Sequence, residues 1–370
     1  MNIIIAMDAM KGSLSSVAAN ELIAAVFKAH GHQTYTIPMA DGGEGTARAL
    51  LANAPSASWC HTATTSPIGD VIQAEYGWVA ATKTAYIDVS AASGIQFKTE
   101  TVHPQHYSSA GTGELIMTAL NQGARKIVVG LGGSATVDGG MGLLSVLGVR
   151  FYDRTGTVLT GSAQQLAEIA YTDVTQLDKR LKDVTLIGAA DVSSPLVGAE
   201  GAVYQFGPQK GFAHAELAQL DEAMQHYLEV TTGEVNSSPG DGAAGGIGFG
   251  LRHFLGAKLV SGADLIAEQA HFTDVLESAD LLITGEGMLD HQSLIGKLPL
   301  SLARKAKQSK VPVIALVGGV SGDAARFRSD GVTVVVPIVQ RVTTIDEAID
   351  EATINLTAAA ERVASLLSLR

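Results

Sequence analysis

The sequence contains little cysteine, few aromatic residues and no cluster of basic residues. Its one cysteine, Cys60, cannot form a disulfide within the chain, and no Cys/His spacing indicates a zinc site. The formal net charge is −12, and lysine and arginine are spread thinly, which argues against nucleic acid as a partner. The histidines are also scattered, so we interpret them as structural or surface residues.

Long hydrophobic runs are missing as well. No apolar stretch approaches the ~20 residues that a membrane-spanning helix needs. The first residues, MNIIIAMD, enter an apolar run without a basic leader, and Asp8 ends that run, which is not the pattern of a secretory signal peptide. We therefore expect a cytoplasmic protein with no membrane partner.

Glycine is abundant, with 41 residues in a chain that is 46% hydrophobic. This composition favours an α/β protein with buried sheets and tight turns at strand ends. Near both ends of the chain, short apolar runs lead into polar, glycine-rich loops and then into amphipathic helices. The pattern predicts strands at 2–7, 34–38, 281–284, 311–317 and 332–336. It predicts helices at 16–30, 44–53 and 345–367, the last opening with Thr344 and Glu347 in capping-box spacing.

The middle of the chain follows another pattern. Residues 61–100 contain short runs broken by Pro and Gly, as in hairpins. A helix capped by Thr112 and stopped by Gly123 is predicted next, followed by strands at 126–131 and 185–190. We predict a doubly wound parallel-sheet domain of residues 1–57 and 276–370, interrupted by an inserted α/β domain of residues 58–275.

Charged or polar residues follow the predicted strands, where ligands bind in open α/β sheets. These residues are Asp8, Lys11, Ser13, Asp41, Glu44, Asp138, Asp191, Glu286, Asp290 and Lys297. Carboxylates alone would repel phosphate, whereas Mg²⁺ between them and phosphate oxygens removes the conflict. Lysine adds positive charge on a transferring phosphoryl group. The pattern indicates an enzyme that uses a magnesium–nucleotide complex and transfers phosphate.

The segment GLGGSATVDGG, residues 130–140, is the densest glycine loop of this kind. Glycine lets the backbone approach a ligand closely, and successive N–H groups can cradle an anion. A structural interpretation also exists, because a glycine-rich turn is often only a turn, and Asp41 and Asp138 could be helix N-caps. The number of polar, glycine-flanked loops at one sheet edge favours the ligand interpretation.

Sequence motifs that are typical of other functions give weaker matches than the phosphate-transfer pattern. Gly130, Gly132 and Ala135 fit the G-x-G-x-x-A dinucleotide fingerprint, with Asp153 near its acidic position, which would indicate an NAD-dependent oxidoreductase. Glycines at 139, 140 and 142 disfavour it, since each costs ~1 kcal/mol in the helix that this motif needs. Neither a P-loop nor a G-x-S-x-G elbow occurs. A non-enzymatic sensor has no DNA-binding helix pair or basic face to support it.

The sequence resembles the glycerate kinase family over nearly its whole length. The segments that carry the resemblance are DAMKGSLSS, PMADGGEGT, GTGELI, GLGGSATVDGG, ADVSSPLVG, FGPQKG, PGDGAAGG and GEGMLDHQSLIGK. Their order and combination are highly specific. The chain departs from the family pattern at Ala9, Met10, Val137, Ala190 and Ser194, and none of these departures removes a charge.

The resemblance implies ATP-dependent phosphorylation of D-glycerate to 2-phosphoglycerate, with Mg²⁺. It also implies a flavodoxin-like domain interrupted by an inserted domain, with the active site in the cleft between them. A kinase that gives 3-phosphoglycerate or acts on a related sugar acid stays an alternative, because the two hydroxyls of glycerate lie on adjacent carbons. A small-molecule substrate is the expected partner, and a homodimer is left open.

Roles can be assigned on this mechanism. Asp191 is the candidate base for the attacking hydroxyl, Asp290 is the second candidate, and Lys11 would neutralise charge on the transferring phosphate. The candidate Mg²⁺ ligands are Asp8, Asp41 and Glu286. The candidate nucleotide-binding residues are Ser13, Gly132, Gly133, Ser134, Thr136, Gly285 and Lys297, although the glycine loop could hold either phosphate or the glycerate carboxylate.

Overall fold

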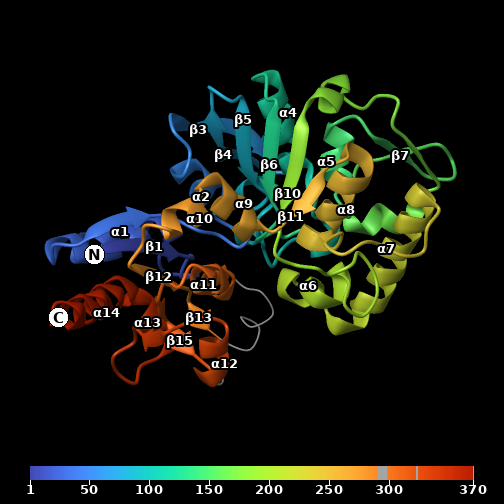
Figure 1. The fold of residues 1–370 in the computed structure, drawn as a ribbon. Helices are drawn as coiled ribbons and strands as arrows, with labels where there is room; N and C mark the ends of the chain where they lie inside the picture. Colours follow the sequence, from blue (N-terminus) through green and yellow to red (C-terminus); the bar gives the residue numbers. More distant parts are fainter. Residues whose placement is uncertain (290–297, 322–323, 370) are drawn as a thin grey trace. The chain divides into compact units, whose positions relative to one another are not determined.

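A computed structural model describes residues 1–289, 298–321 and 324–369 (Figure 1). The chain divides into two compact units. Unit 1 consists of Met1–Asp41, Arg48–Pro55 and Gly262–Arg370, and unit 2 consists of Gly42–Ala47 and Ser56–Ser261. Unit 1 resumes earlier than the expected boundary at 276. The helix after Ser261 is tied to unit 1, since Gln269 Nε2 donates a hydrogen bond to Leu50 O at 2.7 Å.

Unit 1 is built on a parallel sheet. Its strands are β1 (Asn2–Met7), β2 (Gln33–Thr36), β12 (Leu281–Gly285), β14 (Val313–Val317) and β16 (Val334–Pro337). Their order is β2-β1-β12-β14-β16, which is the 2-1-3-4-5 order of a flavodoxin-like sheet. The predicted fold of this part is therefore confirmed.

Helices and one short strand pair complete unit 1. The helices are α1 (Ser16–Ala29), α9 (Gly262–Gln269), α10 (Phe272–Leu276), α11 (Leu298–Gln308), α12 (Ala324–Ser329), α13 (Ile345–Asp350) and α14 (Ala352–Leu367). Helix α2 (Thr46–Ala52) begins with two residues of unit 2 and continues in unit 1. The strand pair is β13 (Met288–Leu289) with β15 (Gly319–Val320). Helices α1 and α14 lie side by side (Figure 1). Their apolar faces, with Phe27 and Leu356, form a core with Ile3 and Ile5 of β1.

Strand β1 is buried on both faces, since Ile3, Ile4 and Ile5 are each at most 2% exposed. This burial explains its unbroken apolar sequence, because a parallel strand covered by helices on both sides has no solvent face. Every residue of β1 from Ile3 to Met7 pairs in register with β12, from Leu281 to Gly285. The carboxyl ends of the two strands therefore coincide.

The C-terminal helix predicted at 345–367 is two helices. The predicted capping box is confirmed, since Thr344 Oγ1 accepts from Glu347 N at 3.3 Å and the Glu347 carboxylate accepts from Thr344 N. Helix α13 then ends at Asp350, and Glu351, with φ −89° and ψ 4°, separates it from α14. Ile345 is 79% exposed, so it does not share the buried face of α14 as predicted.

Unit 2 contains a mixed sheet in the order β11-β10-β6-β5-β4-β3. Its strands are β3 (Ala57–Thr65), β4 (Val71–Val79), β5 (Thr84–Asp88), β6 (Lys126–Gly130), β10 (Thr185–Ala189) and β11 (Lys258–Val260). The β3–β4 and β4–β5 pairs are antiparallel, as the predicted hairpins require, and the other pairs are parallel. A smaller antiparallel sheet joins β7 (Arg150–Tyr152), β8 (Val158–Leu159) and β9 (Tyr171–Asp173).

The helices of unit 2 carry most of the residues that surround its glycine loop. They are α3 (Ser90–Ser93), α4 (Ala110–Asn121), α5 (Met141–Val146), α6 (Ala202–Lys210), α7 (Leu217–Thr232) and α8 (Ala243–Leu255). Helix α4 has Ser109 at its N-cap, so the predicted cap at Thr112 is wrong. Thr112 is fully buried inside the helix, where its hydroxyl contacts that of Ser93 at 2.8 Å.

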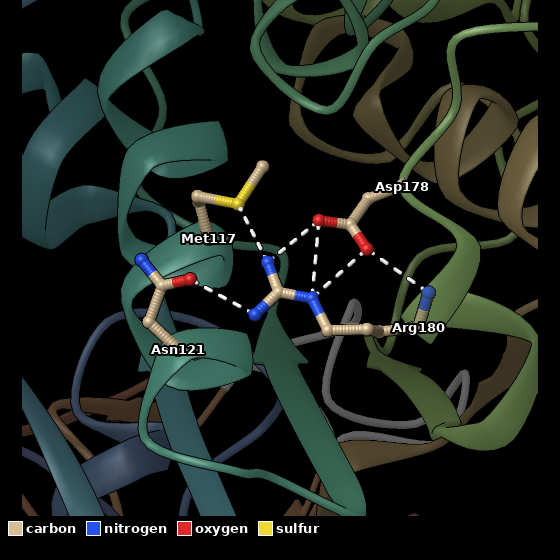
Figure 2. Close-up of polar contacts among 4 residues, drawn as sticks. All are labelled: Met117, Asn121, Asp178 and Arg180. Atoms are coloured by element: carbon tan, nitrogen blue, oxygen red, sulfur yellow. Dashed lines mark hydrogen bonds and ion pairs between the residues drawn. The ribbon is translucent and has the colours of Figure 1, made fainter.

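Arg180 connects a 3₁₀ turn (Lys179–Asp183) to the C-terminal part of α4 (Figure 2). Its guanidinium donates to both carboxylate oxygens of Asp178, the shortest at 2.6 Å. It also donates to Asn121 Oδ1 at 2.9 Å and to Met117 Sδ at 3.3 Å. The bidentate geometry restricts the arginine, so this contact joins the turn to α4.

No helix in the described part of the chain combines the length and the apolar character needed to cross a membrane.

Candidate functional site

The carboxyl ends of β1 and β12 carry two buried acids, Asp8 and Glu286, each 8% exposed. Asp8 N donates to Gly285 O at 2.9 Å, which fixes the chain where both strands end. The Ser16 hydroxyl donates to Met7 O at 2.8 Å and accepts from Met39 N at 2.7 Å. It thereby ties the segment after β2, which leads to Asp41, to the end of β1. Three of the predicted acids thus gather at one sheet edge.

Electrostatics at this edge are unfavourable for another negative charge. Burial, followed by the neighbouring carboxylates of Asp41 and Glu286, raises the pKa of Asp8 to about 8, against the hydrogen bond from Ala9 N and the charge of Lys11. The Ala9 N–H lies 2.7 Å from Asp8 Oδ1. A bound cation would relieve this repulsion, because it favours the ionised form of each acid.

The carboxylates of Asp8, Asp41 and Glu286 are suited to a Mg²⁺ ion that is also coordinated by a bound phosphate compound. Among the described residues, no group of three or more His, Cys, Asp or Glu side chains is arranged to hold a metal ion by itself. Mg²⁺ needs fewer protein ligands, since it commonly takes one or two carboxylates plus phosphate oxygens and water. Asp8, Asp41 and Glu286 therefore suit an ion that arrives with a polyphosphate.

Lys11 and Ser13 occupy the turn between β1 and α1. Lys11 Nζ lies 3.7 Å from Asp41 Oδ2, and its side chain is 85% exposed, so it is free to move toward a ligand. The Ser13 hydroxyl donates to Met10 O at 2.9 Å, which makes it part of the turn itself. Two predicted site residues of this unit, Asp290 and Lys297, lie outside the described residues.

In unit 2 the glycine loop 130–140 follows β6 directly. Helix α5 begins only at Met141, and Gly139 and Gly140 have φ values of +64° and +76°. A dinucleotide fingerprint needs its glycines to open a helix at once, so this geometry disfavours the oxidoreductase interpretation. Asp153 instead closes an exposed turn, where its carboxylate accepts from Thr155 N and Thr157 N at 2.8 Å each.

The loop packs against the segment Gly42–Ala47 of the same unit. A Cβ on Gly132 would lie 2.1 Å from Gly43 Cα, so only glycine allows this backbone contact. Asp88, at the end of β5, accepts hydrogen bonds from Gly45 N at 3.0 Å and Ala47 N at 2.9 Å. Asp88 thereby caps the start of α2 from a distant strand. The sequence reasoning missed it, although an acid ending the run TAYID was a usable signal.

Asp138 is fully buried and saturated with donors. It accepts from Ser109 N at 2.8 Å, Ser109 Oγ at 2.7 Å, Gly140 N at 3.1 Å and Gly142 N at 3.2 Å. Burial raises its pKa, while these hydrogen bonds lower it. The contacts with α4 and α5 agree with the alternative that Asp138 is a helix cap.

Ser134 and Thr136 lie deeper than expected for ligand-binding residues, at 5% and 0% exposure. Lys210, at the end of α6 and 2% exposed, donates from Nζ to Ser134 Oγ and to Thr136 O, both at 2.8 Å. Lys210 belongs to the segment FGPQKG, but the sequence reasoning did not single it out. A lysine inside a motif that is otherwise apolar and glycine-rich was the available signal.

Asp191 lies two residues beyond the end of β10 and is exposed. Strands β5, β6 and β10 are parallel neighbours, so Asp191, Asp88 and the glycine loop belong to one edge of the unit 2 sheet. Solvent exposure leaves the Asp191 carboxylate accessible to a substrate.

Comparison with known proteins covers both units. The model of the glycerate kinase family matches residues 3–368. The chain belongs to the glycerate kinase family. It is 38% identical to the glycerate 2-kinase of Escherichia coli over 379 residues, covering 100% of this chain and 98% of the relative. A glycerate kinase from Bacillus cereus is 39% identical over 373 residues, with 99% and 98% covered.

A solved structure agrees with the fold. A crystal structure named as glycerate kinase 2 from Salmonella typhimurium is 36% identical, with a TM-score of 0.86 over 99% of this chain and 98% of that chain. Membership of a kinase family argues against the NAD-dependent alternative, which rested on the spacing of Gly130, Gly132 and Ala135. The segments DAMKGSLSS and GLGGSATVDGG, which resemble the family, contain the strand-end residues Asp8 and Lys11 of unit 1 and the glycine loop of unit 2.

Proposed function

We propose that this chain transfers the γ-phosphoryl group of ATP to the 2-hydroxyl of D-glycerate, giving 2-phosphoglycerate and ADP. The observation that carries the proposal is similarity to an Escherichia coli glycerate 2-kinase along 100% of the chain. Clustered acids with an adjacent lysine at the end of β1 support it, because phosphoryl transfer depends mainly on positioning and charge neutralisation.

Asp8, Asp41 and Glu286 would hold Mg²⁺ in this reaction. The bound ion would supply the positive charge that lets a polyphosphate approach these acids. Asp8 and Glu286 are equally buried, and the pKa of Asp8 is raised first by burial and then by the charges of Asp41 and Glu286, an effect that a bound cation would oppose. Of the candidate nucleotide-binding residues in this unit, Gly285 ends β12 beside Asp8, and Ser13 shapes the turn that carries Lys11.

Lys11 would stabilise negative charge on the phosphoryl group during transfer. Its ammonium group is accessible, since the side chain is 85% exposed and Nζ lies 3.7 Å from Asp41 Oδ2. A lysine held loosely in the free protein can exchange this contact for a phosphate oxygen without breaking a buried network.

Asp191 is our candidate for the base that takes the proton of the attacking hydroxyl. It follows β10 at the sheet edge that also carries the glycine loop, with Gly132, Gly133 and Ser134. A carboxylate can accept the proton of a hydroxyl that comes within hydrogen-bond distance. Asp290 stays the second candidate.

The first test is a coupled assay of ADP release with Mg-ATP and D-glycerate. Phosphorus NMR of the product separates the two regiochemistries, because a phosphate on C2 couples to one proton and a phosphate on C3 couples to two. A triplet would overturn phosphorylation at O2, and absence of glycerate-dependent ADP release would overturn the kinase proposal.

Variants then test the roles. Lys11→Ala and Asp191→Asn should each lower kcat by ~10²-fold or more with the fold retained. Asp173→Asn is a matched control, since Asp173 ends β9 of unit 2, where its carboxylate accepts from Thr175 N. Near-parental turnover in Asp191→Asn would remove it from the base role and direct attention to Asp290.

A further inference from the structure

Lys210 is a buried lysine that the mechanism above does not use. It is 2% exposed, and its Nζ donates to Ser134 Oγ and Thr136 O, both at 2.8 Å. Both acceptors belong to the glycine loop, 76 and 74 residues earlier in the sequence. A lysine is seldom fully buried unless its charge is compensated and its donors are used.

The surroundings of Lys210 compensate the charge only in part. Burial lowers the pKa of Lys210 to about 7, and the buried carboxylate of Asp138 acts in the opposite direction. Tyr227, also buried, has its pKa raised well above 10 by burial and by Asp138, so it stays neutral. Keeping an ammonium group here costs stability, which suggests that its contacts with the loop have a use beyond packing.

The contact with Lys210 fixes the direction of the Ser134 proton. In its protonated form Lys210 can only donate, so Ser134 Oγ then accepts, and its own O–H points to another acceptor. Within the described residues, the hydrogen bond with Lys210 is the one contact that Ser134 Oγ makes. Ser134 therefore presents a hydroxyl donor, polarised by the adjacent positive charge, that the described protein does not use.

Thr136 gives an independent sign of a missing partner. Thr136 is 0% exposed, and its Oγ1 has no hydrogen-bond partner among the residues that the structure describes, while its carbonyl accepts from Lys210. A buried hydroxyl without a partner costs about 1–3 kcal/mol, and such groups usually meet a ligand or an ordered water. The loop segment that contacts Lys210 thus carries two hydroxyls for which the described residues offer no acceptor.

We propose that Lys210 is a positioning residue that holds the Ser134 hydroxyl as a hydrogen-bond donor to the carboxylate of glycerate. The inference rests on the proposed function and names which anion the glycine loop serves. The acids of unit 1 suit a phosphate that arrives with Mg²⁺, whereas the glycerate carboxylate brings no metal and needs donors. The Asp138 carboxylate offers it no competition for Ser134, because Asp138 is already saturated by four hydrogen bonds.

The experiment compares KM for D-glycerate and for ATP in Ser134→Ala, Lys210→Met and the double variant. Ser134→Ala and Lys210→Met should each raise KM for D-glycerate by about tenfold or more, the loss expected for a hydrogen bond to a charged group. KM for ATP should change little. The double variant should be no worse than Lys210→Met, because both substitutions remove the same interaction.

Lys98→Met is the matched control. Lys98 is an exposed lysine beside the same end of α6, where its Nζ donates to Gln209 O at 3.4 Å and its Cε lies near Gly211. The Lys98→Met substitution removes a lysine near Lys210 and leaves the glycine loop unchanged. The KM values for D-glycerate and for ATP should therefore equal those of the parent protein. Thermal unfolding of each variant separates lost folding from lost binding.

Several outcomes would overturn the inference. Unchanged KM for D-glycerate in Ser134→Ala would do so, as would a rise confined to KM for ATP, which would assign the loop to the nucleotide. Additive losses in the double variant would show that Lys210 does not act through Ser134. If Lys210→Met does not fold, Ser134→Ala decides by itself. Absence of glycerate-dependent turnover in the parent chain would instead reject the proposed function, and this inference with it.

Discussion

Gly132 and Gly43 meet backbone to backbone, so closely that a Cβ on Gly132 would lie 2.1 Å from Gly43 Cα. The same Cβ would lie 2.8 Å from the Gly43 carbonyl carbon and 3.0 Å from Glu44 N. None of these atoms belongs to a side chain that could rotate away. The glycine at 132 is therefore required by packing between two loops of unit 2, whatever ligand the loop also meets.

Gly132→Ala should strongly destabilise the protein, because the backbone of one loop must shift. Urea unfolding should show a loss clearly larger than that of Gly31→Ala. Gly31 has φ +80° and no atom near a built Cβ, so its substitution costs only the ~1–2 kcal/mol of left-handed backbone. Equal losses in the two variants would contradict the close contact between Gly132 and Gly43.

Asp88→Ala should weaken the start of α2. The substitution removes the acceptor for Gly45 N and Ala47 N, and loss of a helix cap costs about 0.5–2 kcal/mol. Asp88→Asn keeps one carbonyl oxygen and should lose less. Urea unfolding measures both, with Asp173→Ala, at the end of β9, as the control. A control loss as large as that of Asp88→Ala would count against the cap.

Stability should fall as pH rises through the range in which Asp8 ionises. Burial, followed by the charges of Asp41 and Glu286, raises its pKa from 3.8 to about 8 in the folded state. The folded protein thus binds more protons than the unfolded chain between these values, and the stabilisation present at low pH is lost on approaching pH 8. Urea unfolding without divalent cations, at about pH 5 and about pH 8, measures this change.

Asp8→Asn is the control for that measurement. It removes the titrating group and should flatten the fall in unfolding free energy between the two pH values. An unchanged fall in Asp8→Asn would assign the pH dependence to other groups. Added Mg²⁺ should also reduce the fall in the parent protein, because a cation favours ionised Asp8 in the folded state.

Lys210 should have the opposite effect at higher pH. Burial lowers its pKa from 10.5 to about 7, so the unfolded chain binds more protons between these values. Unfolding free energy should therefore rise with pH in this window, and the gain is lost as pH falls through about 7. Unfolding at about pH 8.5 and about pH 10 avoids most of the Asp8 titration. Lys210→Met should remove the rise; a rise that persists would contradict its assignment to Lys210.

The fold of unit 1 was predictable because its signals are local. The run NIIIAM is apolar at every position, as a parallel strand covered on both faces must be, and the structure places β1 at those residues. Thr344 and Glu347 formed their capping box because both partners lie within one helical turn. The prediction of a single helix at 345–367 was wrong, because the spacing of the apolar residues does not mark the break at Glu351.

Part of the candidate site could be predicted from the sequence, because the order of strands and loops places certain residues at one sheet edge. Parallel strands bring their carboxyl ends to one edge, so acids that follow β1 and β12, such as Asp8 and Glu286, could be expected to meet. Their electrostatic coupling agrees with that expectation. Their metal-binding role, and the roles of Lys11 and Asp191, remain predictions for the kinetic tests above.

The sequence by itself determined the strands, their following loops and the family, because apolar runs and ordered motifs are written in neighbouring residues. Only the tertiary structure decided that Lys210 donates a hydrogen bond to Ser134, and that Asp88 caps a helix 41 to 43 residues away in the sequence. Burial of a charge and contact between two backbones depend on which distant segments the fold brings together. No spacing within a single segment encodes that choice.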